Sequence, residues 1–376
     1  MRFIKLLLLF FALVSLANAK SQNLKLSDKA QVSVLTCGNG NELYSLFGHT
    51  AVRIYDAETN LDIVYNYGAF DFATPNFVVR FSKGDLQYFV TSSTFEDFLY
   101  SYEYEQRSVV EQTIMMTATQ KQLLFDTLSA TLISNDRFYT YKFIDRNCTT
   151  MVVDLLNGIL GEKVLTKVGS TDVTYREVLY PYFDNHFYEQ LGTSIIFGTK
   201  VDKRAKKVFL PIELYNSVHV AKVDGRPLEK SSRNWLKYDN KNAPMSWWNN
   251  VYTYLAALIL IIVANKNPLN MIFFLIAGLI GTFFLFAGFY SFHGELANNY
   301  NALLFNPALL LLVLFFYAKK DLWFYRTAIF CVVSIAIYLL FVIGKIYILI
   351  VLPLVLALLI IIIRYILKFR KNGVIS

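Results

Sequence analysis

The sequence predicts an α+β exported domain followed by an all-α transmembrane bundle of about five helices. Three observations lead to this prediction: an apolar composition, a short apolar run at the N-terminus, and a series of apolar segments in the last third of the chain. The 376 residues are 55% hydrophobic and only 17% charged. A soluble core of this size needs less apolar surface than that, so part of the chain must face lipid.

The formal net charge of +8 would favour a nucleic-acid partner if it lay on a soluble surface. Its distribution argues against such a partner. Residues 20–250 hold 25 basic and 26 acidic side chains, whereas residues 251–376 hold nine basic and two acidic ones. The positive excess therefore lies between the membrane segments, and the sequence predicts no nucleic-acid partner.

The first twenty residues have the pattern of a secretory signal peptide. Arg2 and Lys5 precede the apolar run Leu6–Leu16, and Ala17-Asn18-Ala19 follows as a small-residue cleavage motif. An uncleaved anchor is the alternative, but the run is short for a membrane span. We therefore expect residues 1–19 to be a signal peptide and the domain that follows to be exported.

The exported domain, residues 20–246, combines strand and helix patterns. Alternating residues predict strands over Val32–Thr36, Thr50–Tyr55 and Ile63–Tyr67. Helical periodicity predicts helices over Thr119–Ile133 and Cys148–Leu160, the second with an apolar stripe and a glycine stop. This mixture predicts an α+β fold.

Residues 247–376 form the predicted transmembrane domain, with five apolar segments: about Val251–Ala264, Met271–Tyr290, Ala302–Ala318, Trp323–Ile343 and Tyr347–Leu367. The second and fifth reach the roughly 20 residues that a helix needs to cross hydrocarbon, whereas the first and third are short. With the exported domain outside, most Lys and Arg residues fall on inner connectors and the tail, and the outer connectors hold only Lys345. The positive-inside rule therefore favours five crossings and a cytoplasmic C-terminus.

Cys148 is the candidate nucleophile. It lies in Asp145-Arg146-Asn147-Cys148-Thr149-Thr150, immediately before an apolar helix that Asn147 can cap. At the first turn of a helix, free backbone N–H groups and the helix dipole lower the pKa of a thiol. The same N–H groups can hold the oxyanion of an acyl-transfer intermediate.

A nucleophilic cysteine needs a base, and His49 is the candidate. It begins a strand directly after Gly48, which permits a close backbone approach. The neighbouring strand would place Gly68 opposite His49 and leave room for the imidazole ring.

The strand register offers a third member of the site. If the hairpin closes between Asp56 and Leu61, Ala51 lies opposite Asn66. Asn66 is then a diagonal neighbour of His49 on the same face, where an amide can orient the imidazole.

Other residues compete for these roles. Asp71 and Glu42 are alternatives for the orienting position. Cys37 and Cys148 are the only exported cysteines once Cys331 is placed in the fourth span, and two cysteines in an oxidising compartment can form a disulfide.

The remaining histidines carry weaker signals. His186 and His219 lack a nearby nucleophile or ligand cluster, so we expect structural roles for them. No Cys or His pair has the close spacing of zinc ligands, and neither a metal nor a cofactor is predicted. His293 lies in the polar loop Ser291–Asn301, for which a solvated loop is the favoured interpretation. The alternative places this loop under the exported domain, where it shapes a lipid entrance.

Five motifs together resemble a known family: Thr36-Cys37-Gly38-Asn39-Gly40, Leu46-Phe47-Gly48-His49-Thr50-Ala51, Tyr65-Asn66-Tyr67-Gly68, Asn147-Cys148-Thr149-Thr150 and Phe209-Leu210-Pro211. They are similar to motifs of the Lnb-type lipoprotein N-acyltransferases, and the resemblance covers nearly the whole mature chain. That family resembles permuted NlpC-type papain-like folds, in which the His strand precedes the Cys helix. The resemblance therefore implies a permuted papain-like fold for the exported domain.

The resemblance also implies a reaction. A fatty acyl chain would move from a membrane phospholipid, through a Cys148 thioester, to the α-amine of a diacylated lipoprotein. The catalytic set would be Cys148, His49 and Asn66, in a periplasmic domain on the bacterial inner membrane. A membrane-tethered cysteine hydrolase, either peptidase or lipase, is the alternative enzyme. A sensor or scaffold with a Cys37–Cys148 disulfide is the non-enzymatic alternative.

Overall fold

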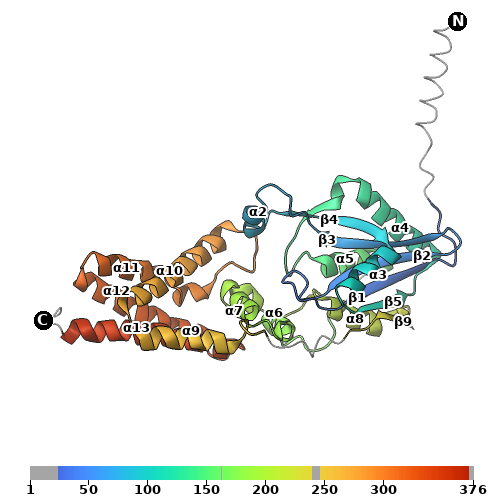
Figure 1. Ribbon diagram of the computed structural model, residues 1–376. Coiled ribbons are helices and arrows are strands. Elements are labelled where there is room, and N and C mark those ends of the chain that lie inside the picture. Colours follow the sequence, from blue (N-terminus) through green and yellow to red (C-terminus); the bar gives the residue numbers. More distant parts are fainter. Residues whose placement is uncertain (1–23, 162, 239–245, 372–376) are drawn as a thin grey trace, which may run out of the picture.

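The computed structural model of the chain describes residues 24–161, 163–238 and 246–371 (Figure 1). The signal peptide predicted over residues 1–19 lies outside the described residues. Two parts are seen along the molecule: a sheet covered by helices, and a bundle of long helices. The predicted order of an α+β part followed by an all-α part is confirmed.

Seven antiparallel strands form the main sheet, in the spatial order β6-β4-β3-β2-β1-β5-β9. Their bounds are β1 (Gln31–Cys37), β2 (His49–Asp56), β3 (Leu61–Ala69), β4 (Gln87–Thr94), β5 (Val109–Ile114), β6 (Phe138–Thr140) and β9 (Glu229–Leu236). The first three strands occupy the three predicted segments. A separate hairpin pairs β7 (Lys222–Val223) with β8 (Arg226–Pro227).

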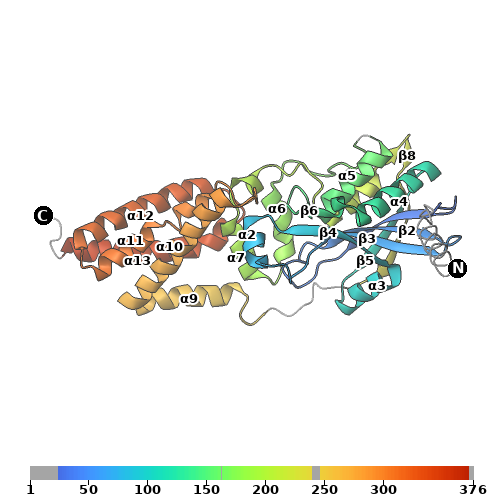
Figure 2. The same ribbon diagram turned by 90° about the horizontal axis from the view of Figure 1, so that it is seen from above.

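Helices cover both faces of this sheet (Figure 2). One face carries α4 (Ala118–Ile133), α5 (Cys148–Leu160) and α8 (Pro211–Val220), and the other carries α3 (Phe95–Tyr104). Val52 and Ile54 belong to the core beneath the three helices, whereas their neighbour Ala51 packs in the core with α3. Successive strand residues point to opposite faces, so both faces of β2 are buried. The predictions of α4 and α5 are confirmed.

The bundle contains α9 (Val251–Ala264), α10 (Asn267–Tyr290), α11 (Ala308–Tyr317), α12 (Asp321–Val342) and α13 (Ile348–Lys371), with the 3-10 turn η5 (Tyr300–Leu303) before α11. Five apolar helices thus occur where five were predicted. Four segments are long and apolar enough to cross a membrane, when η5 and α11 are taken together. The 14 residues of α9 extend only about 21 Å, less than the roughly 30 Å of hydrocarbon. A fifth crossing, and with it the cytoplasmic C-terminus, stays a prediction.

A layer of short helices joins the sheet to the bundle: α6 (Tyr175–Leu179), η2 (Tyr180–Phe183), α7 (Phe187–Ile196) and η3 (Thr199–Asp202). Its central contact is a partly buried ion cluster around Asp202. Arg176 and Lys345 each place a nitrogen 2.7 Å from the Asp202 carboxylate, and the Tyr300 hydroxyl donates to it at 2.7 Å. Because Lys345 and Tyr300 belong to the bundle, this cluster fixes the two parts of the molecule together.

The polar loop after α10 is not solvated, so the favoured sequence interpretation was wrong. Glu295 is 1% exposed, pairs with Lys200 at 2.8 Å, and accepts a hydrogen bond from the Gly198 N–H at 2.7 Å. Asn299 donates to two carbonyls at the end of α7. The loop packs against the layer of short helices at the end of the predicted exported domain, where Glu295 and Asn299 have protein partners.

We predict that Arg176→Ala lowers the free energy of unfolding by roughly 3 kcal/mol, because it removes a buried cation and leaves the partly buried Asp202 carboxylate with one partner fewer. Arg204→Ala is the matched control, since Arg204 pairs with Asp172 on the surface and should change stability by less than about 0.5 kcal/mol. Chemical denaturation in detergent measures both. Equal effects from the two variants would contradict the role assigned to the cluster.

Candidate active site

Cys148 begins α5, and the capping of this helix fixes its position. The Asn147 side-chain oxygen accepts a hydrogen bond from the Thr150 N–H at 2.9 Å, and the Thr150 hydroxyl accepts one from the Asn147 N–H at 2.8 Å. The Asn147 amide donates to the carbonyls of Phe143 and Phe209 at 2.8 and 2.9 Å. The predicted cap is confirmed, and it ties the helix end to two other segments.

The surroundings of Cys148 lower the pKa of its thiol. Burial opposes ionisation, but the charge of the His49 imidazole and a hydrogen bond with that side chain outweigh it, assisted by the Thr50 backbone and the Thr149 hydroxyl. The thiol also lies at the positive end of α5, where a thiolate is favoured. Cys148 is half-buried and carries a free thiol.

His49 is brought to Cys148 by a backbone conformation that favours glycine. Gly48 has φ +78°, and a Cβ at this position would lie 2.5 Å from the Cys37 carbonyl oxygen. Only a residue without a side chain lets β2 begin this close to β1. The expected close approach at Gly48 is therefore confirmed.

Asn66 contacts His49 as the strand register predicted. Ala51 pairs with Asn66 and Asp56 with Leu61, and the His49 Nε2 lies 3.2 Å from the Asn66 Oδ1. An amide oxygen only accepts hydrogen bonds, so this contact requires the proton on Nε2. The other ring nitrogen, Nδ1, then has a lone pair free to take a proton.

The alternative orienting residues lie elsewhere. The Asp71 carboxylate accepts from the Ala73 N–H at 2.8 Å within its own turn, and Glu42 is exposed. Gly68 differs from its prediction. A Cβ there would lie 3.7 Å from the Cys148 Cβ, so this glycine leaves room for the cysteine and not for the imidazole. The pairing of β2 with β3 ends at Ala51 and Asn66, so it does not reach His49 and Gly68, and β3 has a bulge against β4 between Asn66 and Ala69.

Cys37 lies opposite His49 in the pairing of β1 with β2, whereas His219 lies on the surface. Cys37 is 2% exposed and free, and burial raises the pKa of its thiol to about 12. His219 pairs with Glu229 at 2.6 Å on the surface. Within the described ranges, no group of three His, Cys, Asp or Glu side chains has the arrangement of a metal site.

Tyr139 on β6 is a candidate that the sequence analysis missed. Its side chain is 2% exposed, and among the described residues its buried hydroxyl has no hydrogen-bond partner. A Cβ on Gly68 would lie 3.9 Å from this hydroxyl and 3.7 Å from the Cys148 Cβ, so both groups border the same small space. Burial raises the pKa of Tyr139, and the phenol therefore stays protonated and able to donate. The aromatic run Phe138–Tyr141, shortly before Cys148, is the signal that could have found it.

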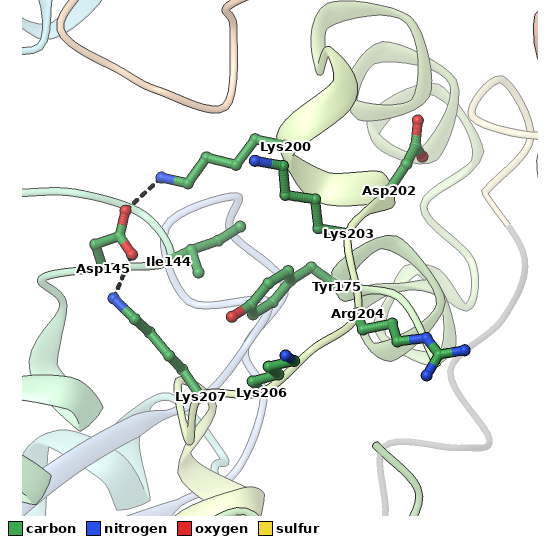
Figure 3. A pocket seen from close by; sticks show the side chains of 9 residues that line it. All are labelled: Ile144, Asp145, Tyr175, Lys200, Asp202, Lys203, Arg204, Lys206 and Lys207. Atoms are coloured by element: carbon green, nitrogen blue, oxygen red, sulfur yellow. Dashed lines mark hydrogen bonds and ion pairs between the residues drawn. The ribbon is translucent and has the colours of Figure 1, made fainter. Parts of the chain in front are cut away.

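A basic cavity of about 710 Å³ lies beside the turn that leads to Cys148 (Figure 3). It is lined by Ile144, Asp145, Tyr175, Lys200, Asp202, Lys203, Arg204, Lys206 and Lys207. Partial burial opposes ionisation of Asp145, but hydrogen bonds from Lys200 and Lys207 outweigh it and lower its pKa. Neither Cys148 nor His49 lines the cavity, so it adjoins the nucleophile without enclosing it.

We predict that His49→Ala moves the pH profile of Cys148 alkylation by iodoacetamide to higher pH. Only the thiolate reacts with iodoacetamide. Without the imidazole, burial raises the pKa of the Cys148 thiol, so the alkylation rate at pH 7 should fall at least about tenfold. Asn66→Ala should shift the profile in the same direction by less. His219→Ala is the control and should change nothing. An unshifted profile in His49→Ala would show that the ring does not act on the thiol.

Comparison with known proteins identifies the two parts of the chain. Residues 18–180 match the family described as the Lnb N-terminal periplasmic domain, and residues 242–372 match the Lnb transmembrane domain. No curated protein and no solved structure matches the chain. The first match contains Cys148, His49 and every strand of the main sheet except β9, and the second contains all five apolar helices. The chain therefore belongs to the Lnb family, as a membrane protein whose N-terminal domain lies in the periplasm.

Proposed function

We propose that this protein is a lipoprotein N-acyltransferase of the bacterial inner membrane. It moves an acyl chain from a phospholipid to Cys148 and then to the α-amine of a diacylglyceryl-cysteine lipoprotein. The observation that carries the proposal is the chain of contacts from Cys148 to His49 to Asn66, at the start of a helix in a membrane-attached domain. A thiol, a base and an orienting amide are the parts that covalent acyl transfer requires.

The first half of the reaction loads the enzyme. His49 takes the proton from the Cys148 thiol, and the thiolate attacks an ester carbonyl of the phospholipid. When the tetrahedral intermediate collapses, the ester C–O bond breaks and the thioester C–S bond remains. His49 returns its proton to the departing alkoxide, which leaves as lysophospholipid.

The second half transfers the acyl group. The uncharged α-amine of the lipoprotein attacks the thioester carbonyl, and His49 takes one proton from the amine nitrogen. The attack forms the C–N bond, and collapse of the intermediate restores the carbonyl and breaks the C–S bond, which leaves the amide. The proton on His49 then returns to the Cys148 thiolate, so the enzyme is restored.

Both intermediates carry an oxyanion, and the chain offers two donors for it. One is the backbone N–H at the start of α5, which has no helical acceptor because it belongs to the first turn. The other is the Tyr139 hydroxyl, which is buried, protonated and free of any described partner. The space beside Gly68 lies between Tyr139 and Cys148, and it is where the reacting carbonyl would sit.

The bundle supports the same proposal, because both substrates are held in the membrane. In the proposed topology α9 completes five crossings, and the basic end of α13 at Lys368, Arg370 and Lys371 lies in the cytoplasm.

We predict that the purified protein, incubated with phospholipid alone, gains one acyl mass on the peptide that contains Cys148. Neutral hydroxylamine should remove it, and a diacylated lipopeptide with a free amine should receive the chain. Cys148→Ala should abolish loading, and Cys37→Ala should retain it. Intact-protein and peptide mass spectrometry measure these outcomes. Rapid release of free fatty acid without lipopeptide would instead identify a hydrolase, and a native Cys37–Cys148 disulfide would contradict both enzymes.

We predict that Tyr139→Phe slows acyl loading by roughly a hundredfold, since one oxyanion donor is lost. Alkylation of Cys148 by iodoacetamide forms no oxyanion, so its rate should stay at the wild-type value. Tyr65→Phe is the matched control, because its hydroxyl lies 3.2 Å from Ser129 in the same domain. If Tyr139→Phe slowed alkylation as much as loading, the residue would have only a structural role.

A further inference from the structure

The short helix α2 (Phe77–Lys83), in the connection between β3 and β4, has no buried residue. Its exposed side chains are nevertheless largely apolar. Val78 is 72% and Val79 62% exposed, and Phe72 in the turn before the helix is 69% exposed. An apolar surface of this kind on a membrane protein marks an interaction site. Arg80 adds positive charge beside it, whereas Lys83 is paired with Asp85 at 2.7 Å.

The helix is fixed to the outer end of the bundle. The carbonyls of its last three residues accept hydrogen bonds from the three residues that follow α10. The pairs are Phe81 with His293 Nε2 at 2.8 Å, Ser82 with Ser291 Oγ at 2.8 Å, and Lys83 with the Phe292 N–H at 2.7 Å. Figure 1 shows α2 at this end of α10.

This attachment sets the depth of α2. The 24 residues of α10 extend about 36 Å, slightly more than the roughly 30 Å of hydrocarbon in a bilayer. The end of α10 therefore lies at the outer boundary of the membrane. Phe289 there is 92% exposed and Tyr290 47% exposed, as expected of side chains that contact lipid. The apolar surface of α2 continues this lipid-facing surface.

A row of aromatic rings leads inward from α2. Neighbouring rings in this row have centroids 4.5 to 6.3 Å apart, in the order Phe81, Phe77, Phe70, Tyr88 and Tyr141. Tyr141 and Cys148 pack against the same hydrophobic core. The row thus connects the membrane boundary with the surroundings of the nucleophile.

We propose that α2 and Phe72 lie in the outer leaflet of the bilayer, and that the aromatic row takes one acyl chain of a membrane lipid toward Cys148. The partner is the lipid surface, which is recognised by apolar contact with the hydrocarbon and by Arg80 at the level of the phosphates. The second part of this proposal rests on the proposed acyl transfer, whereas the first part does not.

Depth-dependent quenching tests the first part. An environment-sensitive fluorophore is attached to Val79→Cys in a Cys148→Ser protein, which is then placed in vesicles. Cys37 and Cys331 are buried and do not compete for the label. Phospholipid with a nitroxide near the start of its acyl chain should quench this probe by more than half. A probe at Ile133, 91% exposed at the end of α4, is the matched control and should not be quenched. Equal, weak quenching at both sites would overturn the membrane contact.

Charge substitution tests the second part. The double variant Val78→Asp, Val79→Asp should slow loading of Cys148 from vesicle phospholipid at least tenfold, while Ile133→Asp loads like the wild type. Loading from a water-soluble short-chain ester and alkylation by iodoacetamide should be unchanged in both. Unchanged vesicle loading in the double variant would overturn the acyl path. Absence of loading in the wild type would count against the proposed function, with the quenching result still deciding the position of α2.

Discussion

The candidate site depends on the hydrogen bonds of one side chain, Asn147. Many helices are capped by Ser, Thr or Asp, whose side chains also accept from the first backbone N–H groups. Here the amide additionally donates to the carbonyls of Phe143 and Phe209. Neither Asp nor Ser has two side-chain N–H donors, and either would leave a buried carbonyl without a partner. Asparagine is needed because its side chain joins three segments at the start of α5. These hydrogen bonds fix the position of Cys148 relative to His49.

A second constraint acts between the sheet and the bundle. Two carboxylates, Asp202 before the bundle and Glu295 within it, are each paired with cations from the other part, Lys345 and Lys200. Buried ion pairs add little net stability, but they tolerate few alternative geometries. The sheet therefore has a fixed height above the bilayer. In the proposed reaction Cys148 attacks a lipid ester, and this height then matters as much as the pairing of Cys148 with His49.

Local patterns in the sequence were enough for β1, β2 and β3, for α5 and for the contact between His49 and Asn66. Their positions follow from a short hairpin and a cap, both encoded within a few residues. Two features were not predictable in this way. The pairing of β2 with β3 ends at Asn66, so the extrapolated position of Gly68 opposite His49 is not reached. The partners of the loop after α10, such as Lys200 for Glu295, lie far away in the sequence, so its polar composition resembled that of a solvated loop.

In the proposed reaction, the outcome of the thioester depends on which nucleophile reaches it. An α-amine has a pKa of about 7.7–8.0, so near neutral pH a substantial fraction is uncharged and reactive. Water is far more concentrated but is a weaker nucleophile, and apolar walls lower its local concentration. The aromatic side chains between α2 and Tyr141 provide such walls, and they also favour the uncharged amine over its ammonium form. In this proposal, an apolar path from the membrane admits the lipid chain and excludes water, and both effects favour acyl transfer over hydrolysis. Cys148 and His49 then need no special feature to distinguish the amine from water.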